Sequence, residues 1–105
     1  MLNLKLKTIA NLVNKNDTVI DIGCDHAYLA IYLKKEKLCK KVYASDISGN
    51  VINIAKKNIK DNNVQIDIFL SDGFKNISNN DINTAIISGM GASTILNIVK
   101  MPQKI

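Results

Sequence analysis

Residues 18–28 read TVIDIGCDHAY and pass from a short apolar run, through a glycine turn, into an apolar helical segment. Val19, Ile20 and Ile22 make the run, and residues 27–33 (AYLAIYL) supply the helical segment. A strand, a tight turn and a helix in this order predict a ligand-binding loop at the carboxyl end of a strand. Gly23 suits the turn because glycine tolerates a positive φ, and the following helix points unpaired N–H groups at the loop.

The charge of this loop indicates which ligand it takes. A dinucleotide-binding loop follows the pattern G-x-G-x-x-G, but here Asp25 stands at the second glycine position. A carboxylate a few ångströms from a pyrophosphate costs on the order of a few kcal/mol at an effective dielectric near 20. Asp21 and Asp25 instead favour a nucleoside ligand that carries positive charge and no phosphate. S-adenosyl-L-methionine, with its sulfonium and ammonium groups, is the predicted cofactor.

The composition allows one small globular domain. The chain has 105 residues, of which 47% are hydrophobic, and a formal net charge of +5. All 14 basic residues are Lys, and Asn (14) and Ile (17) are also abundant. The positive net charge therefore has two possible explanations, an anionic partner such as nucleic acid or an AT-rich genome, and both stay open.

Metal binding, a membrane span and an oxidising compartment find no support in the sequence. Cys24 and Cys39 are not in a CxxC pair, and His26 is the only histidine, so a zinc site is not expected. The longest apolar run, residues 27–33, is far short of the roughly 20 residues that span a bilayer. Two thiols without a signal peptide fit the cytoplasm, which is the predicted location.

Strands and helices are expected to alternate along the chain. The first expected elements are a helix carrying Leu2, Leu6, Ile9 and Val13, a strand ending at Ile22, a helix from Ala27 and a strand from Val42 to Asp46. Next come a helix capped by Ser48, with Val51, Ile52, Ala55 and Ile59 on one face, and a strand over residues 64–70. The last expected elements are a short helical segment with Phe74 and Ile77, a strand over residues 82–88, and a helix with Ile95, Leu96, Ile98 and Val99. This order predicts a doubly wound, parallel α/β sheet with the strand at 64–70 on its edge.

The carboxyl ends of the four expected strands carry small or acidic residues. In parallel sheets these ends meet at one site. Asp46, at the end of the second strand, is placed to bind ribose hydroxyls, although it could also only cap the next helix. Asp72 ends the third strand within reach of an adenine amino group, or it is a plain turn residue. The lysines at positions 34, 35, 37, 40 and 41 close a helix at the opposite edge, where cations favour a helix C-terminus, and this reading is preferred over a nucleic-acid patch.

Two further residues have open roles. His26 lies in the first turn of a helix without a catalytic partner visible in the sequence, so lining a ligand or a structural role is favoured over acid–base catalysis. Met90 stands between two glycines, where it could contact a planar substrate or pack in the core.

Four motifs together resemble a known family. DIGCDHAYLAIYL (21–33), ASDIS (44–48), SDGF (71–74) and SGMGA (88–92) resemble, in order and spacing, the bacterial tRNA adenine-22 N1-methyltransferases, a class I methyltransferase family. The resemblance implies a Rossmann-like fold over residues 1–105 with the first four strands in the order 3-2-1-4, S-adenosyl-L-methionine as cofactor and tRNA as partner. The family continues through further strands and a helical extension, so the chain is expected to be truncated at its C-terminus.

The resemblance, combined with the positions above, defines the candidate residues. Asp25 would be the catalytic residue, an acidic side chain next to the reacting adenine. The cofactor would be bound by Asp21, Gly23, Cys24, Asp46, Ile47, Asp72, Gly73 and Gly89, and the substrate by His26, Tyr28, Met90, Gly91 and Lys5. The expected function is methyl transfer to N1 of an adenine in tRNA. The alternatives are a truncated, catalytically inactive cofactor-binding fragment and a small-molecule methyltransferase. With no strand beyond residues 82–88, that strand is expected to be an unprotected edge through which the chain self-associates.

Overall fold

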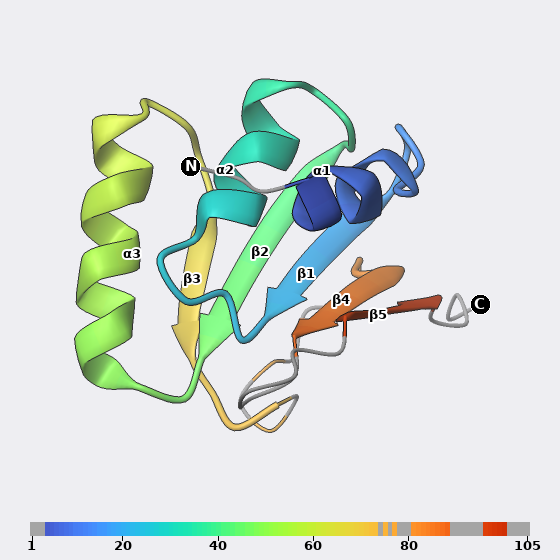
Figure 1. Ribbon diagram of the computed structural model, residues 1–105. Helices are drawn as coiled ribbons and strands as arrows, with labels where there is room; N and C mark the ends of the chain where they lie inside the picture. Colours follow the sequence, from blue (N-terminus) through green and yellow to red (C-terminus); the bar gives the residue numbers. More distant parts are fainter. Residues whose placement is uncertain (1–3, 74, 76, 78–80, 89–95, 101–105) are drawn as a thin grey trace.

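The computed structural model of this chain describes residues 4–73, 75, 77, 81–88 and 96–100, and Figure 1 shows their arrangement. These described residues form three helices and five strands: α1 (Leu4–Asn11), β1 (Thr18–Ile22), α2 (Tyr28–Lys35), β2 (Lys41–Asp46), α3 (Gly49–Asp61), β3 (Asp67–Leu70), β4 (Thr84–Ser88) and β5 (Leu96–Lys100). The strands form one sheet in the order β3-β2-β1-β4-β5.

The first four strands confirm the predicted parallel sheet and its order 3-2-1-4. β1 lies in the middle and pairs in parallel with β2 on one side and β4 on the other. Ile20 of β1 is the Cα partner of Tyr43 on β2 and of Ala85 on β4. β3 pairs only with β2 in the described sheet, so the prediction that it forms an edge is confirmed.

The three helices pack on one face of this sheet, as Figure 1 shows. Most of their buried residues share one core with the sheet residues Val19, Val42, Ala44 and Ile86. The opposite face of the sheet carries a second, smaller core built on Ile20, Ile22, Tyr43 and Ala85, against which Phe69, Ile77, Ile82 and Ile87 pack. Strand residues therefore alternate between two apolar faces, which is the pattern of a strand buried on both sides.

Helix α3 follows its sequence pattern closely. The Ser48 hydroxyl accepts a hydrogen bond from the Val51 N–H at 3.3 Å, which confirms the predicted N-cap. Ile52, Ala55 and Ile59 are buried, so the predicted apolar face is the one that packs on the sheet.

The prediction for the C-terminal part of the fold is wrong. Leu96–Lys100 forms strand β5, antiparallel to β4, where the sequence predicted a helix; Ile95 lies outside the described residues. Two β-branched residues, Ile98 and Val99, favour a strand, and pairing satisfies the backbone groups of the apolar strand β4. The prediction that β4 is an exposed edge is therefore also wrong. Self-association of the chain stays a prediction, without β4 as its free edge.

The segment around β3 differs from the expectation in detail. β3 begins at Asp67 and not at residue 64, and Leu70 is 55% exposed. The alternation predicted Leu70 on a buried side, but it lies at the end of an edge strand that α3 only partly covers. No helix is found at the described residues 75 and 77, and Phe74 lies outside the described part.

We predict that Leu33→Ala, at a fully buried position of α2, lowers the free energy of unfolding by about 2 to 5 kcal/mol. The reason is the lost apolar contact together with the cavity that the smaller side chain leaves. Leu12→Ala, at an exposed position, is the control and should change the free energy by less than about 0.5 kcal/mol. Urea unfolding of both variants measures the difference, and equal effects would contradict the placement of Leu33 in the core.

Candidate active site

The loop between β1 and α2 is tied to the end of β2 by its backbone. The N–H groups of Gly23 and Cys24 both donate to the carbonyl oxygen of Ser45, at 2.9 and 2.8 Å. The Ala27 N–H donates to the Cys24 carbonyl at 2.8 Å and closes a turn before the helix begins. The loop is therefore compact, and it lies at the carboxyl edge of the sheet, as the sequence predicted.

Three residues of this loop have left-handed backbone conformations. Gly23 has φ 77°, Asp25 has φ 53° and Ala27 has φ 68°. Glycine adopts such angles at little cost, whereas a non-glycine residue in this region costs about 1 to 3 kcal/mol. Strain of this kind persists only where the surrounding structure holds it, and it is concentrated at functional sites.

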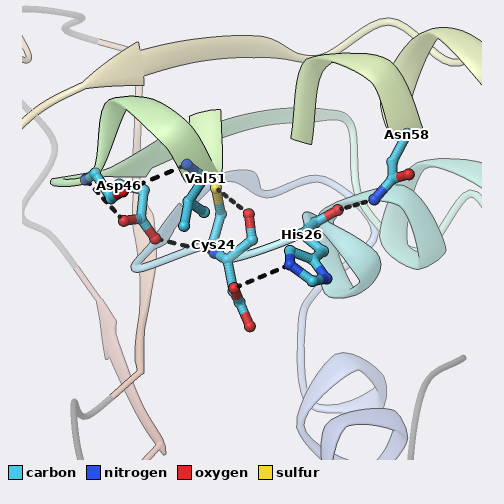
Figure 2. A network of polar contacts seen from close by, with 7 residues as sticks. Cys24, His26, Asp46, Val51 and Asn58 are labelled. Atoms are coloured by element: carbon cyan, nitrogen blue, oxygen red, sulfur yellow. Dashed lines mark hydrogen bonds and ion pairs between the residues drawn. The ribbon is translucent and has the colours of Figure 1, made fainter. Parts of the chain in front are cut away.

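Asp46 connects three loops at this edge. Its Oδ2 accepts the Asp25 N–H at 3.0 Å, and its Oδ1 accepts the Ser48 N–H at 3.1 Å, as Figure 2 shows around the labelled Asp46. Its carbonyl oxygen accepts the Ser71 N–H at 2.9 Å. The ends of β1, β2 and β3 are thereby held together, which confirms that these strand ends converge. Because Ser48 itself caps α3, Asp46 does more than cap a helix.

Asp21 is the most deeply buried carboxyl group at the site. The residue is 1% exposed, and its Oδ1 has no hydrogen-bond partner among the described residues. Burial, and then the charges of Asp46 and Asp25, raise the pKa of Asp21 to about 7. A buried group that prefers to be neutral, yet sits beside two carboxylates, is stabilised in its charged form by a cationic ligand.

Cys24 contributes its backbone hydrogen bonds and its packing to the loop. Its thiol is buried, and its Sγ lies 3.7 Å from the Asp25 carbonyl oxygen. Burial, and then the charges of Asp21, Asp46 and Asp25, raise the pKa of Cys24 well above its ordinary range. Both the burial and the direction of this pKa shift favour the neutral thiol over the reactive thiolate.

The side chains of Asp25, His26 and Tyr28 form the exposed rim of the loop. The Asp25 side chain is 77% exposed, and its Oδ1 lies 3.8 Å from Nε2 of His26. The rings of His26 and Tyr28 meet edge to face, with centroids 5.7 Å apart. A carboxylate and two aromatic rings thus face solvent together, a surface that suits a planar substrate.

Three candidate residues lie next to Asp46 or just after the end of β3: Ile47, Asp72 and Gly73. Ile47 is 58% exposed although it is apolar. Asp72 is exposed and forms an ion pair with Lys75 at 3.2 Å. At Gly73 (φ 59°), a Cβ atom would meet nothing within 4 Å among the described residues. The side of the site near Ile47 and Gly73 is therefore open enough for a ligand to approach the backbone.

Four candidates remain, and the structure describes one of them. Lys5 lies in the first turn of α1, which packs against α2. Gly89, Met90 and Gly91 lie outside the described residues.

One contact at the loop was missed by the sequence analysis. The side-chain Nδ2 of Asn58 on α3 donates to the His26 carbonyl oxygen at 2.9 Å. A signal for it exists, because position 58 follows Ala55 by one turn and falls on the apolar side of α3, where a polar residue needs a partner.

The lysine cluster lies at the opposite edge of the sheet, as predicted. Lys34 and Lys35 are in the last turn of α2, and a cavity of about 320 Å³ at the start of β2 and β3 is lined by Lys34, Lys40, Lys41, Val42, Gln65 and Asp67. In the described part of the chain, no group of three or more His, Cys, Asp or Glu side chains could hold a metal ion. Within the same residues, no helix has the length and apolar character needed to cross a membrane.

We predict that Asp21→Asn removes a pH-dependent loss of stability. The pKa of Asp21 in the fold, about 7, lies above its ordinary 3.8. The contribution of Asp21 to the free energy of unfolding is therefore full below pH 3.8 and is lost as the pH rises through 7. The unfolding free energy of wild type relative to Asp21→Asn should therefore fall between pH 4 and 7, with a slope approaching about 1.4 kcal/mol per pH unit. Urea unfolding across this range measures it, and a constant difference would contradict the buried state of Asp21.

Known proteins resemble this chain over nearly its whole length. A family model described as a methyltransferase domain matches residues 2–105. A putative tRNA methyltransferase of Mycoplasma genitalium is 41% identical over 103 residues, which cover 94% of this chain and 47% of that protein. The tRNA (adenine(22)-N(1))-methyltransferase of Bacillus subtilis is 28% identical over 101 residues, covering 94% of this chain and 42% of that protein.

A solved structure agrees with these matches. TrmK of M. capricolum, in complex with S-adenosyl-homocysteine, has a TM-score of 0.77 and 38% identity to this chain, over 87% of this chain and 42% of that chain. The chain spans about half the length of the curated relatives that it matches. These similarities confirm the resemblance to tRNA methyltransferases that the sequence motifs predicted. Because the family model covers residues 2–105, the chain belongs to the methyltransferase-domain family.

Proposed function

We propose that the chain binds S-adenosyl-L-methionine and transfers its methyl group to N1 of an adenine in tRNA. The observation that carries the proposal is the buried Asp21 carboxyl, whose Oδ1 has no partner among the described residues, beside Asp25 and Asp46. Three carboxyl groups at this edge of the sheet suit a cationic ligand and oppose a phosphate. The S-adenosyl-homocysteine complex of the M. capricolum relative supports the same cofactor.

The other residues at this edge fit such a cofactor. Each side-chain oxygen of Asp46 accepts one backbone hydrogen bond and keeps a further lone pair. These lone pairs would accept hydrogen bonds from the ribose hydroxyls. Ile47 offers an exposed apolar surface to the adenine ring. The Asp72 carboxylate would accept a hydrogen bond from the adenine amino group, and the open space at Gly73 would let the adenine ring approach.

When bound, the cofactor supplies an electrophilic methyl group, whose bond to sulfur breaks as the bond to N1 forms and whose electron pair stays on sulfur. The residues of the loop supply position and charge. Adenine N1 attacks as a neutral nucleophile, so no strong base is needed, but the ring gains positive charge. Asp25 would stabilise this charge and orient the exocyclic amine from its exposed position.

The tRNA substrate is supported by the names of the relatives, which include tRNA methyltransferases. An adenine reaches such a site only when it is unstacked, because its N1 edge is otherwise paired or covered. His26 and Tyr28 offer ring surfaces for it, and we include Met90, Gly91 and Lys5 in the substrate site on the resemblance of their motifs. The two free thiols, Cys24 and Cys39, suit the cytoplasm, where we place the reaction.

A second candidate function is cofactor binding without methyl transfer by this chain. The observation that favours it is that the chain spans about half the length of its curated relatives. A small-molecule methyltransferase is the third candidate. The two experiments below separate the three.

We predict that Asp46→Ala weakens binding of S-adenosyl-homocysteine by at least about a hundredfold, because two charge-assisted hydrogen bonds contribute about 1.5 to 3 kcal/mol each. Asp25→Ala should change the affinity by less than about threefold, since the Asp25 side chain points to solvent. Calorimetry measures both, with thermal unfolding of each variant as the control for folding. Equal losses in the two variants would refute this division of roles.

We also predict that the chain transfers labelled methyl to a tRNA transcript and that Asp25→Ala lowers the rate by about a hundredfold or more. The matched control is a transcript with guanine in place of adenine at position 22, the position named for the B. subtilis relative. Binding of the cofactor product without any transfer would support the cofactor-binding fragment. Labelling of free nucleosides at the same rate as tRNA would support the small-molecule enzyme.

A further inference from the structure

The carbonyl oxygen of His26 has its partner on a separate element, the side chain of Asn58 on α3. Nδ2 of Asn58 donates to it at 2.9 Å, and Figure 2 shows the Asn58 amide pointing at the His26 backbone. Because a carbonyl oxygen can only accept, the side chain must present its NH₂ group here. Asn58 thereby ties the loop to the helix.

The loop needs such a tie because its conformation is strained. Asp25 (φ 53°) and Ala27 (φ 68°) stand on either side of His26, and each costs about 1 to 3 kcal/mol in this region. Asp46 holds the loop on one side, through the Asp25 N–H. Asn58 holds it on the other side, through the His26 carbonyl. The two hydrogen bonds come from different elements and enclose the residue that carries the exposed carboxylate.

We infer that Asn58 is a positioning residue, which holds the loop in the conformation that presents Asp25 to the substrate. The inference rests on the proposed function for the role of Asp25, but the loop geometry stands on its own. Asp46 serves both the loop and the proposed ribose site, so its substitution cannot separate the two. Asn58 acts through the His26 backbone, and its substitution tests the positioning of Asp25 apart from cofactor binding.

The first test is amide hydrogen exchange of the whole chain without cofactor. The Asp25 N–H is bonded to Asp46 and the Ala27 N–H to the Cys24 carbonyl, so both report whether the loop is closed. In Asn58→Leu, which keeps the size of the side chain but loses the donor, exchange at both amides should rise by about tenfold. Exchange at Ile20, in the centre of the sheet, should stay unchanged.

Two variants control this test. Asn53→Leu makes the same substitution at an exposed position of α3 and should leave exchange in the loop unchanged. Asn58→Gln keeps an NH₂ donor on a longer side chain and should return exchange toward the wild-type rate. Unchanged exchange at Asp25 and Ala27 in Asn58→Leu, or an equal rise in Asn53→Leu, would overturn the inference.

The second test uses methyl transfer to tRNA. Asn58→Leu should lower kcat by about tenfold while the Kd for S-adenosyl-homocysteine changes by less than about threefold, and Asn58→Gln should restore kcat in part. An active chain whose kcat does not change in Asn58→Leu contradicts the positioning role. A chain without transfer contradicts the proposed function, and the exchange experiment then decides the role of Asn58 by itself.

Discussion

The hydrogen bond from the Asp25 N–H to the Asp46 carboxylate, at 3.0 Å, is the contact on which the site depends. It joins the loop after β1 to the end of β2, and the same carboxylate receives the Ser48 N–H at the start of α3. A charged acceptor makes such bonds about twice as strong as neutral ones. This one side chain therefore sets the spacing between the loop, the second strand and the helix that follows it.

The Asp46 carboxylate also disfavours the charged form of the buried Asp21. Among the described contacts of Asp21, no lysine offsets this repulsion. Asp46 and Asp25 lie near the buried Asp21 and contribute to its raised pKa. Burial of like charges destabilises a protein unless a ligand of opposite charge relieves it. Together with the left-handed angles of the loop, this arrangement places strain and unbalanced charge at the one edge where a ligand is expected. Sites that sacrifice stability in this way are commonly functional.

The C-terminal strands show how a local pattern can favour the wrong element. Residues 95–99 contain apolar positions that fit a helix, yet 96–100 forms β5 along β4. A short apolar run is ambiguous between helix and strand, and here the unpaired backbone of β4 decides in favour of the strand. Leu70 is a second case, since the alternation of its neighbours predicts burial but the helix layer does not extend over it.

The sequence by itself determined the parallel sheet, its strand order through the motif resemblance, the Ser48 cap, the buried face of α3 and the convergence of acidic residues at the carboxyl edge. These features follow from local periodicity, turn chemistry and the spacing of motifs along the chain. Only the tertiary structure decided that Asp46 holds the Asp25 backbone, that Asp21 is sealed from solvent, and that Asn58 reaches His26 across 32 positions of sequence. These depend on how separate elements pack, because burial and hydrogen-bond partners arise from contacts between segments distant along the chain. A local pattern can show that Asn58 needs a partner, but it does not show which residue the partner is.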